Sequence, residues 1–121
     1  MITISIVIIT TAGLYAFYKQ YQQRNIEKDI PTLISNGAIM LDVRTPAEYT
    51  KGHIEGSINI ALSKLRDENL PLDKDKTYIT CCSHGLRSIK AVEVLKAKGY
   101  RNIYNGGPCS DLEKKIRDSA D

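Results

Sequence analysis

The sequence has few of the residues that bind metal ions or build disulfide frameworks. Its 121 residues include only three cysteines and two histidines. His53 and His84 lie far apart, and Cys81, Cys82 and Cys109 have no Cys-x-x-Cys spacing. Metal sites usually need closely spaced ligands, and small disulfide scaffolds need more cysteines. We therefore expect no metal, no other cofactor and no disulfide framework.

The sequence also lacks a concentration of charge of one sign. The formal net charge is +3, but Lys and Arg are mixed with Asp and Glu in segments 65–69, 72–76 and 111–118. Mixed charges are typical of solvated surfaces, whereas a nucleic-acid interface usually carries a basic stripe. We expect no nucleic-acid partner. The length and the 42% hydrophobic content suit one folded domain.

The first segment has no charged residue from Ile2 to Tyr18. As a helix rising about 1.5 Å per residue, this run reaches the lower length limit for crossing the hydrocarbon core of a bilayer. We predict a membrane anchor at residues 2–18, within an N-terminal segment of residues 1–24 that also begins a polar stalk. A cleaved signal peptide and a buried first strand are the alternatives. However, no basic region precedes the run and no small-x-small cleavage site follows it.

The residues after this run bear on its orientation. Lys19, Arg24 and Lys28 follow it, and basic residues tend to stay on the cytoplasmic side. We therefore expect a cytoplasmic domain, with a periplasmic or secreted domain as the alternative if the segment is cleaved. The end of the run is also rich in tyrosine, which suits a membrane–water interface. These tyrosines are Tyr15, Tyr18 and Tyr21.

Residues 25–121 alternate between short apolar runs and helix-like segments. The apolar runs predict strands at 38–43, 57–61, 76–81 and 101–105. Helices are predicted within 27–37 and 45–52, and at 62–70, 88–99 and 111–118. Short apolar strands alternating with helices indicate an α/β fold with a central parallel sheet of about four to five strands and helices on both faces. Sites in such sheets form at the carboxyl ends of the strands.

A short loop joins the third predicted strand to the helix after it. Gly85 supplies the backbone freedom for a tight turn, which would point backbone N–H groups inward. These groups, the helix N-terminus near Ser88 and the guanidinium of Arg87 would together favour an anion. Cys82 lies where the turn begins, so its thiolate would be stabilised as a nucleophile. Cys81 continues the strand and is predicted to be a buried apolar residue facing the opposite way.

These positions resemble the single-domain rhodaneses, a family of sulfurtransferases. The family loop Cys-x-x-Gly-x-Arg-Ser/Thr is matched at residues 82–88. A second signature, Asp-Val-Arg followed by Glu-Tyr, Gly-His-Ile and Gly-Ser, is matched at residues 42–60. The resemblance covers residues 29–121 and implies a rhodanese-like domain over residues 25–121. The family often has an aromatic residue after its double glycine, whereas this chain has Pro108 and Cys109 and contains no Trp.

The resemblance implies a role for each residue of the loop. Cys82 would be the catalytic nucleophile, and the rest of the loop would bind substrate through Ser83, His84, Gly85, Leu86, Arg87 and Ser88. Asp42 and Arg44 would support the neighbouring loop through ion pairing. Glu48 and His53 are interpreted as scaffold residues that hold a short helix and turn in place.

The activity implied is the transfer of sulfane sulfur through a cysteine persulfide. The donor would be a small sulfur-containing anion such as thiosulfate, and the acceptor would be cyanide, a thiol or a protein. Two other functions stay open: a noncatalytic membrane-tethered interaction or sensor module, and a phosphatase that uses Cys81, from which Arg87 follows at Cys-x5-Arg spacing. Gly85 lies three residues after Cys82, as in rhodaneses, and this spacing favours sulfur transfer.

Cys109 has three interpretations at this stage. It is an exposed free thiol, a packed small residue, or a resolving cysteine that condenses with oxidised or persulfidated Cys82. A disulfide between Cys81 and Cys82 is not expected, because it would strain the backbone.

Overall fold

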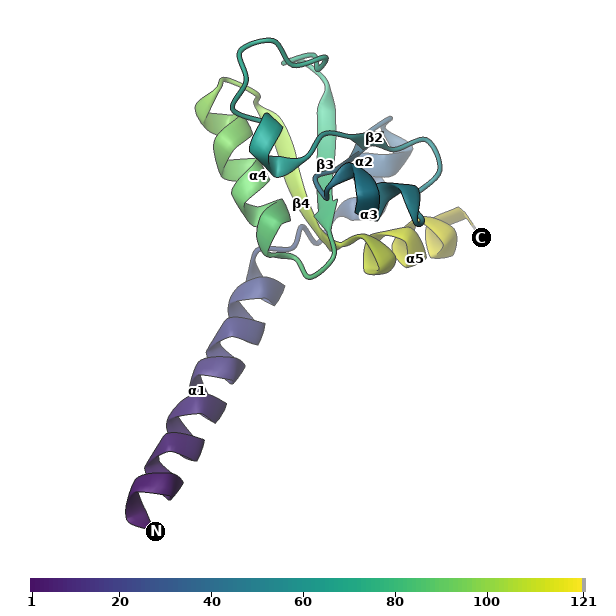
Figure 1. Ribbon diagram of the computed structural model, residues 1–121. Helices are drawn as coiled ribbons and strands as arrows, with labels where there is room; N and C mark the ends of the chain where they lie inside the picture. The colour runs from purple at the N-terminus through teal and green to yellow at the C-terminus, as the bar shows by residue number, and fades with distance from the viewer. Residues whose placement is uncertain (121) are drawn as a thin grey trace.

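The computed structural model describes residues 1–120, and the side chains of all of these except residues 23, 24 and 120. A long N-terminal helix, α1 (Ile2–Arg24), extends away from an α/β domain (Figure 1). The domain contains the strands β1 (Ile39–Asp42), β2 (Ile58–Asn59), β3 (Thr77–Cys82) and β4 (Asn102–Pro108). Its helices are α2 (Ile30–Ser35), α3 (Pro46–Thr50), the 3-10 turn η1 (Leu62–Lys64), α4 (Leu86–Ala97) and α5 (Cys109–Ala120).

The four strands form one parallel sheet in the order β2-β1-β3-β4. All of the strands therefore end at the same edge, and β3 lies in the middle of the sheet with partners on both sides. This confirms the predicted α/β class, with four strands in the sheet. Because β3 is flanked by both neighbours, its residues are almost completely buried.

Side-chain alternation along β3 builds two separate cores. On one face, Tyr78 and Cys82 pack with residues of α4 such as Leu95. On the other face, Ile79 and Cys81 pack with residues of α2 and α5. The prediction of helices on both faces is thus confirmed, and adjacent cysteines are placed on opposite sides of the sheet.

Several elements differ in length from the sequence-based expectation. The helix predicted at 62–70 is wrong, because only the short turn η1 forms. The chain after η1 is held by the ammonium group of Lys98, which donates hydrogen bonds to the carbonyls of Leu65 and Asp67. β4 runs to Pro108, past an irregularity in its pairing with β3, and α5 begins directly at Cys109.

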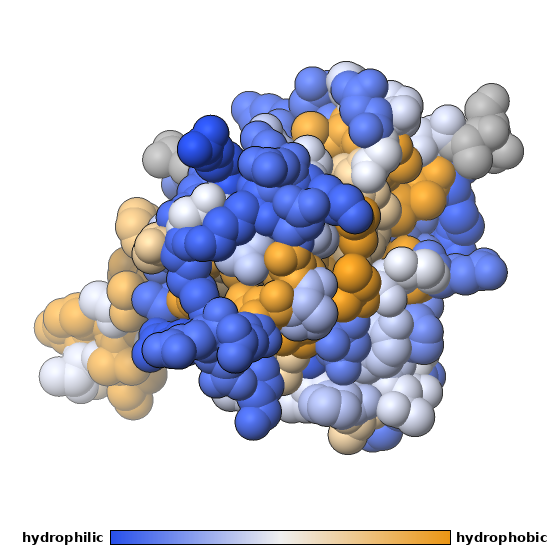
Figure 2. Space-filling model, turned by 90° about the horizontal axis from the view of Figure 1, so that it is seen from above, coloured by the Kyte–Doolittle hydropathy of each residue, from blue (hydrophilic) through white to orange (hydrophobic). Residues whose placement is uncertain are grey.

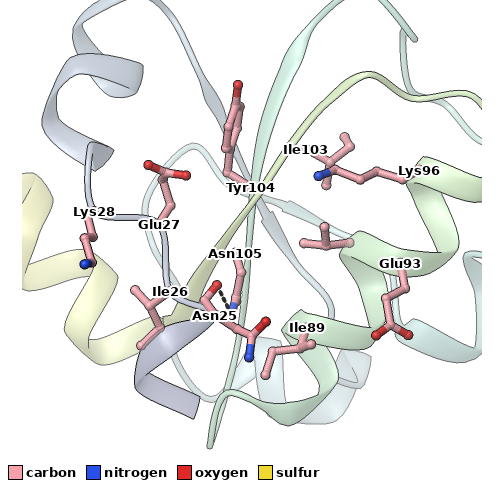
Figure 3. A pocket seen from close by; sticks show the side chains of 11 residues that line it. Asn25, Ile26, Glu27, Lys28, Ile89, Glu93, Lys96, Ile103, Tyr104 and Asn105 are labelled. Carbon is pink, nitrogen blue, oxygen red and sulfur yellow. Dashed lines mark hydrogen bonds between the residues drawn. The ribbon is translucent and has the colours of Figure 1, made fainter. Parts of the chain in front are cut away.

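The connection from α1 to the domain is fastened along β4. The side-chain amide of Asn105 donates to the carbonyl of Asn25 at 3.0 Å, drawn as a dashed line in Figure 3. The backbone N–H of Glu27 donates to the carbonyl of Asn105 at 2.8 Å. Ile26 fills the space beside Gly107. A Cβ atom added to Gly107 would lie 2.8 Å from the Cδ1 atom of Ile26. These contacts fix the point at which α1 leaves the domain.

Candidate functional site

The predicted nucleophile lies in a cradle of backbone amides. Cys82 is the last residue of β3 and its side chain is buried. Its Sγ atom accepts hydrogen bonds from the N–H of Gly85 at 2.9 Å and from the N–H of Ser88 at 3.4 Å. Gly85 has a φ of +93°, in the left-handed region that favours glycine, and this geometry turns the loop back over the sulfur.

The first turn of α4 completes this cradle. The Ser88 hydroxyl donates to the carbonyl of Gly85 at 2.9 Å, and Ser88 itself is buried. The N-terminal end of α4 therefore points its free N–H groups toward the Cys82 sulfur, and the helix dipole favours negative charge there. The geometry suits a thiolate, or a larger anion built on the same sulfur.

Arg87 is held in place by a carboxylate that sequence analysis treated as scaffold. Its guanidinium donates two hydrogen bonds to Glu48, from Nη1 to Oε1 at 2.7 Å and from Nη2 to Oε2 at 2.8 Å. The Ser83 hydroxyl donates to the same carboxylate at 2.8 Å. The hydrogen bonds from Arg87 are the main reason that the pKa of Glu48 lies far below its ordinary range, and the Glu48 carboxylate in turn raises the pKa of Arg87.

Glu48 also takes part in the start of its own helix. Its Oε1 atom accepts from the backbone N–H of Thr45 at 3.1 Å, and the Thr45 hydroxyl accepts from the Glu48 N–H. This capping box holds α3 at the rim of the cradle. The scaffold interpretation of Glu48 was therefore incomplete. The sequence held one signal for this second role. Glu48 lies in the first turn of the helix that follows β1, and β1 ends at the same edge of the sheet as β3.

Asp42 and Arg44 form an ion pair beside the cradle. The Arg44 Nη2 atom lies 2.6 Å from Asp42 Oδ2 and also donates to the carbonyl of Gly52 at 2.8 Å. The hydrogen bond to Asp42 is the largest contribution to the raised pKa of Arg44. The pair ties the end of β1 to the turn after α3. Within the part of the chain that the structure describes, the side-chain hydrogen bonds of Asp42 and Arg44 stay within residues 42–52 and do not reach the loop around Cys82.

The remaining predicted loop residues are solvent-accessible. His84 is exposed, and its carbonyl accepts a hydrogen bond from the Gln22 side chain of α1. Leu86 is 43% exposed. His53, by contrast, lies on the scaffold: its ring stacks on Tyr49 with centroids 3.6 Å apart, and its Nδ1 lies 2.8 Å from the Tyr49 carbonyl oxygen.

The structure pairs Cys81 with Cys109 in a disulfide, which corrects the interpretation of both residues. The Cα atoms are 4.9 Å apart, and both residues are buried on the α5 side of the sheet. None of the three interpretations of Cys109 included this partner. The pairing also removes Cys81 as a nucleophile, so the Cys-x5-Arg phosphatase lacks its thiol. Cys82 is the free cysteine.

Three possible metal ligands lie close together at the disulfide, but their closeness does not make them a metal site. The ligand atoms of Asp42, Cys81 and Cys109 lie within 4.8 Å of one another. The two sulfur atoms are bonded to each other, and the Asp42 carboxylate is held by Arg44. We therefore assign no metal to this group.

Taken together, the fold and the cradle define a class of protein. A buried cysteine sulfur receives amide hydrogen bonds at a helix N-terminus, with an arginine at the rim, at the carboxyl edge of a parallel sheet. Such a site can carry a covalent group on sulfur and stabilise its negative charge. The family model for the rhodanese-like domain matches residues 20–107. The chain therefore belongs to the rhodanese-like family.

Known proteins of this family are similar to the chain over most of the domain. The thiosulfate sulfurtransferase PspE of Escherichia coli (strain K12) is 34% identical over 74 residues, which are 60% of this chain and 71% of the relative. The thiosulfate sulfurtransferase GlpE of Ectopseudomonas mendocina (strain ymp) is 36% identical over 73 residues, which are 60% of this chain and 67% of the relative. A crystal structure of a rhodanese-related protein from Thermoplasma volcanium has 40% sequence identity and a TM-score of 0.56, covering 65% of this chain and 80% of its own.

Proposed function

We propose that this protein is a membrane-anchored sulfurtransferase that moves sulfane sulfur from a thiosulfate-like anion to a thiophilic acceptor. The observation that carries the proposal is the Cys82 sulfur held by the amides of Gly85 and Ser88. The rhodanese-like family and the two similar thiosulfate sulfurtransferases support the reaction class. Cyanide and small thiols are the acceptors that the chemistry favours, and a protein thiol is a further candidate.

The reaction would proceed in two displacements. The Cys82 thiolate attacks the outer sulfur of thiosulfate, the S–S bond of the donor breaks with its electron pair, and sulfite leaves. The persulfide that forms on Cys82 is an anion, which the amides of the cradle stabilise. The acceptor then attacks the terminal sulfur, and Cys82 departs as a thiolate. Splitting the transfer into two steps predicts double-displacement kinetics.

Arg87 would orient the anionic donor at the rim of the cradle. A guanidinium fork matches oxyanion geometry, but here it is engaged by Glu48. The donor therefore meets a neutral ion pair rather than a free cation, and it must either share the guanidinium or displace the carboxylate. The ion pair is therefore expected to weaken the binding of an anionic donor relative to a free guanidinium.

The test of the reaction is intact-mass spectrometry of the full chain after brief thiosulfate treatment. The wild type is expected to gain the mass of one sulfur atom, and Cys82→Ser is expected to gain none. The matched control, Cys81→Ser/Cys109→Ser, leaves Cys82 as the only cysteine and should still gain the sulfur. An adduct that persists in Cys82→Ser, or its absence from the wild type, contradicts the proposal and leaves the noncatalytic module.

The anchor is supported by the length and exposure of α1. Residues Ile2–Gln22 form a helix that is long and apolar enough to cross a membrane, and none of it is buried against the domain. At about 1.5 Å per residue it matches a hydrocarbon core of about 30 Å. Viewed from above, apolar side chains gather on α1 where it projects beyond the domain, whose face in this view carries both hydrophilic and hydrophobic areas (Figure 2).

Two features bear on the side of the membrane that the domain occupies. Lys19 and Lys28 follow the apolar run and favour the cytoplasm. The Cys81–Cys109 disulfide favours an oxidising compartment, because thiols in the cytosol are kept reduced. We place the domain on the oxidising side, since the disulfide is part of the packed core whereas the charge bias is small. This departs from the cytoplasmic expectation, and also from its alternative of a cleaved segment, because α1 is kept here as the anchor.

A further inference from the structure

The catalytic loop carries an exposed apolar side chain that its own domain does not cover. Among the described residues that follow α1, Leu86 is the one large hydrophobic residue that is exposed. It follows Gly85 directly and begins α4, so it lies on the outer surface of the loop that cradles Cys82. An isolated exposed leucine is ordinary on a protein surface. Leu86 differs from an isolated leucine because it lies next to the apolar helix α1.

The C-terminal end of α1 is in contact with this loop. Tyr21, Leu86 and Ile89 line a hollow of about 240 Å³ between α1 and α4. A second hollow of about 270 Å³ separates Tyr18 and neighbouring residues of α1 from the 83–85 segment. The Gln22 side chain donates to the His84 carbonyl across this gap. Tyr21 therefore links the apolar surface of α1 to Leu86 across the first hollow, whereas Lys19 and Asp111 also line the second.

The orientation of α1 carries this surface toward one side of the molecule. In Figure 1, the strands end at the lower edge of the domain, and α1 extends downward from that same edge. The loop between η1 and β3 lies at the opposite, upper end. The contacts of Asn25, Ile26 and Glu27 with β4 hold this arrangement. A membrane crossed by α1 would therefore meet the carboxyl edge of the sheet first.

We propose that the catalytic loop rests on the surface of the bilayer that α1 spans, with Leu86 and Tyr21 at the headgroup level. Tyrosine prefers this level because its ring is apolar and its hydroxyl is polar. The partner that covers the apolar surface is lipid, because the surface is continuous with the helix that enters the hydrocarbon. The inference rests on the proposed anchor, and it means that sulfur carried by Cys82 is transferred at the membrane surface.

The absence of tryptophan from the chain makes this contact measurable. Single tryptophans are introduced in the full chain as Leu86→Trp and, as a second loop probe, His84→Trp. Tyr18→Trp reports on the anchor, and Asn69→Trp reports on the exposed loop at the far end of the domain. Each variant is inserted into vesicles of phosphatidylcholine with bromine near the headgroup, and quenching of tryptophan emission is measured. A zwitterionic lipid suits the test, because Lys90 and Glu93 give the surface both signs of charge.

The loop probes are expected to lose emission as Tyr18→Trp does, while Asn69→Trp keeps its emission. If both loop probes behave like Asn69→Trp while Tyr18→Trp is quenched, the anchor stands and the docking of the loop is overturned. If Tyr18→Trp is unquenched as well, both the anchor and the docking are overturned. Thiosulfate treatment and mass measurement of the wild-type chain in the same vesicles test sulfur loading separately, so quenched loop probes together with a wild type that gains no sulfur would reject the sulfurtransferase and keep the docking.

Discussion

Glu48 joins two parts of the site with one carboxylate. It completes the capping box of α3 through Thr45, and it occupies the guanidinium of Arg87 through a pair of hydrogen bonds. A glutamine at this position can keep the capping box, since its side-chain oxygen still accepts from the Thr45 N–H. The charge of the carboxylate and its role at the helix start can therefore be separated by experiment.

Replacement of Glu48 by Gln is expected to lower the KM for thiosulfate by about threefold to tenfold, equivalent to about 0.6–1.4 kcal/mol. The reason is that Arg87 would lose its competing anion and become available to the donor. Steady-state kinetics with thiosulfate and cyanide measure the effect. Glu55→Gln, which removes an exposed charge, is the control for net charge. A raised KM in Glu48→Gln would show instead that the carboxylate is needed to position Arg87.

The same variant predicts a change in the pH dependence of stability. The pKa of Glu48 lies below its ordinary value of 4.5, so the ionised carboxylate stabilises the fold at pH values above 4.5. This contribution, at most about 1 kcal/mol for a partly exposed pair, is lost as the pH falls toward the lowered pKa. The difference in urea unfolding between the wild type and Glu48→Gln should therefore stay constant above about pH 5 and shrink as the pH falls from there to about pH 3. A constant difference across this range would contradict the assignment.

At the scale of elements, the end of β4 packs its backbone closely against β3. A Cβ on Gly106 would lie 2.8 Å from the Thr80 carbonyl oxygen and 2.8 Å from Ile79 Cγ2. The first of these atoms belongs to the backbone of β3 and cannot rotate away. β4 therefore approaches β3 closely only because residue 106 has no side chain.

Gly106→Ala is expected to destabilise the domain by about 3 kcal/mol, the upper range for overpacking. The comparison is Gly99→Ala, where φ is +96° but the nearest atoms belong to the flexible end of Lys74. That variant should cost only about 1 kcal/mol for the left-handed conformation. Thermal unfolding followed by circular dichroism measures both. Equal melting temperatures for the two variants would show that the sheet can shift to admit the methyl group.

The order of elements and the cradle could be predicted from the sequence because they depend on local signals. Apolar runs separated by Gly and Pro marked the strands, and Gly85 marked the turn over Cys82. The segment after Leu62 was predicted as a helix because it lacks local breakers before Pro71, but Lys98, far along the chain, holds it as a loop. The Arg87–Glu48 pair was missed for the same reason, since its partners are brought together only by the sheet.

At the scale of the molecule, the Cys81–Cys109 disulfide joins the middle of the sheet to its last helix. The bond links residues 28 apart in sequence, and the loop it closes includes α4 and β4. The pairing had a sequence signal that was not used: with Cys82 set aside, two cysteines remain, and both follow predicted strands toward the same sheet edge. The geometry of the edge, which the sequence does not give in detail, brings them into contact.

Loss of this bond in Cys109→Ser is expected to lower the free energy of unfolding by about 2–4 kcal/mol. Dithiothreitol should lower the melting temperature of the wild type similarly and leave that of the variant unchanged. Because both cysteines are buried, the location of the domain is tested by lysing acid-quenched cells in denaturant with an alkylating reagent, followed by mass measurement. A fully alkylated Cys81 and Cys109 would place the domain in the cytosol and contradict the assignment to the oxidising side.

Two adjacent cysteines of one strand are in different chemical states, because Cys81 is disulfide-bonded and Cys82 is free. Here Cys81 and Cys82 belong to cores on opposite faces of the sheet. Thiol–disulfide exchange requires the attacking sulfur to approach along the S–S bond that breaks. The backbone of β3 lies between the Cys82 sulfur and the disulfide and prevents this approach. The sheet thus separates the two sulfur atoms, so that a disulfide-bonded cysteine and a free cysteine can occupy consecutive positions of the chain without reacting.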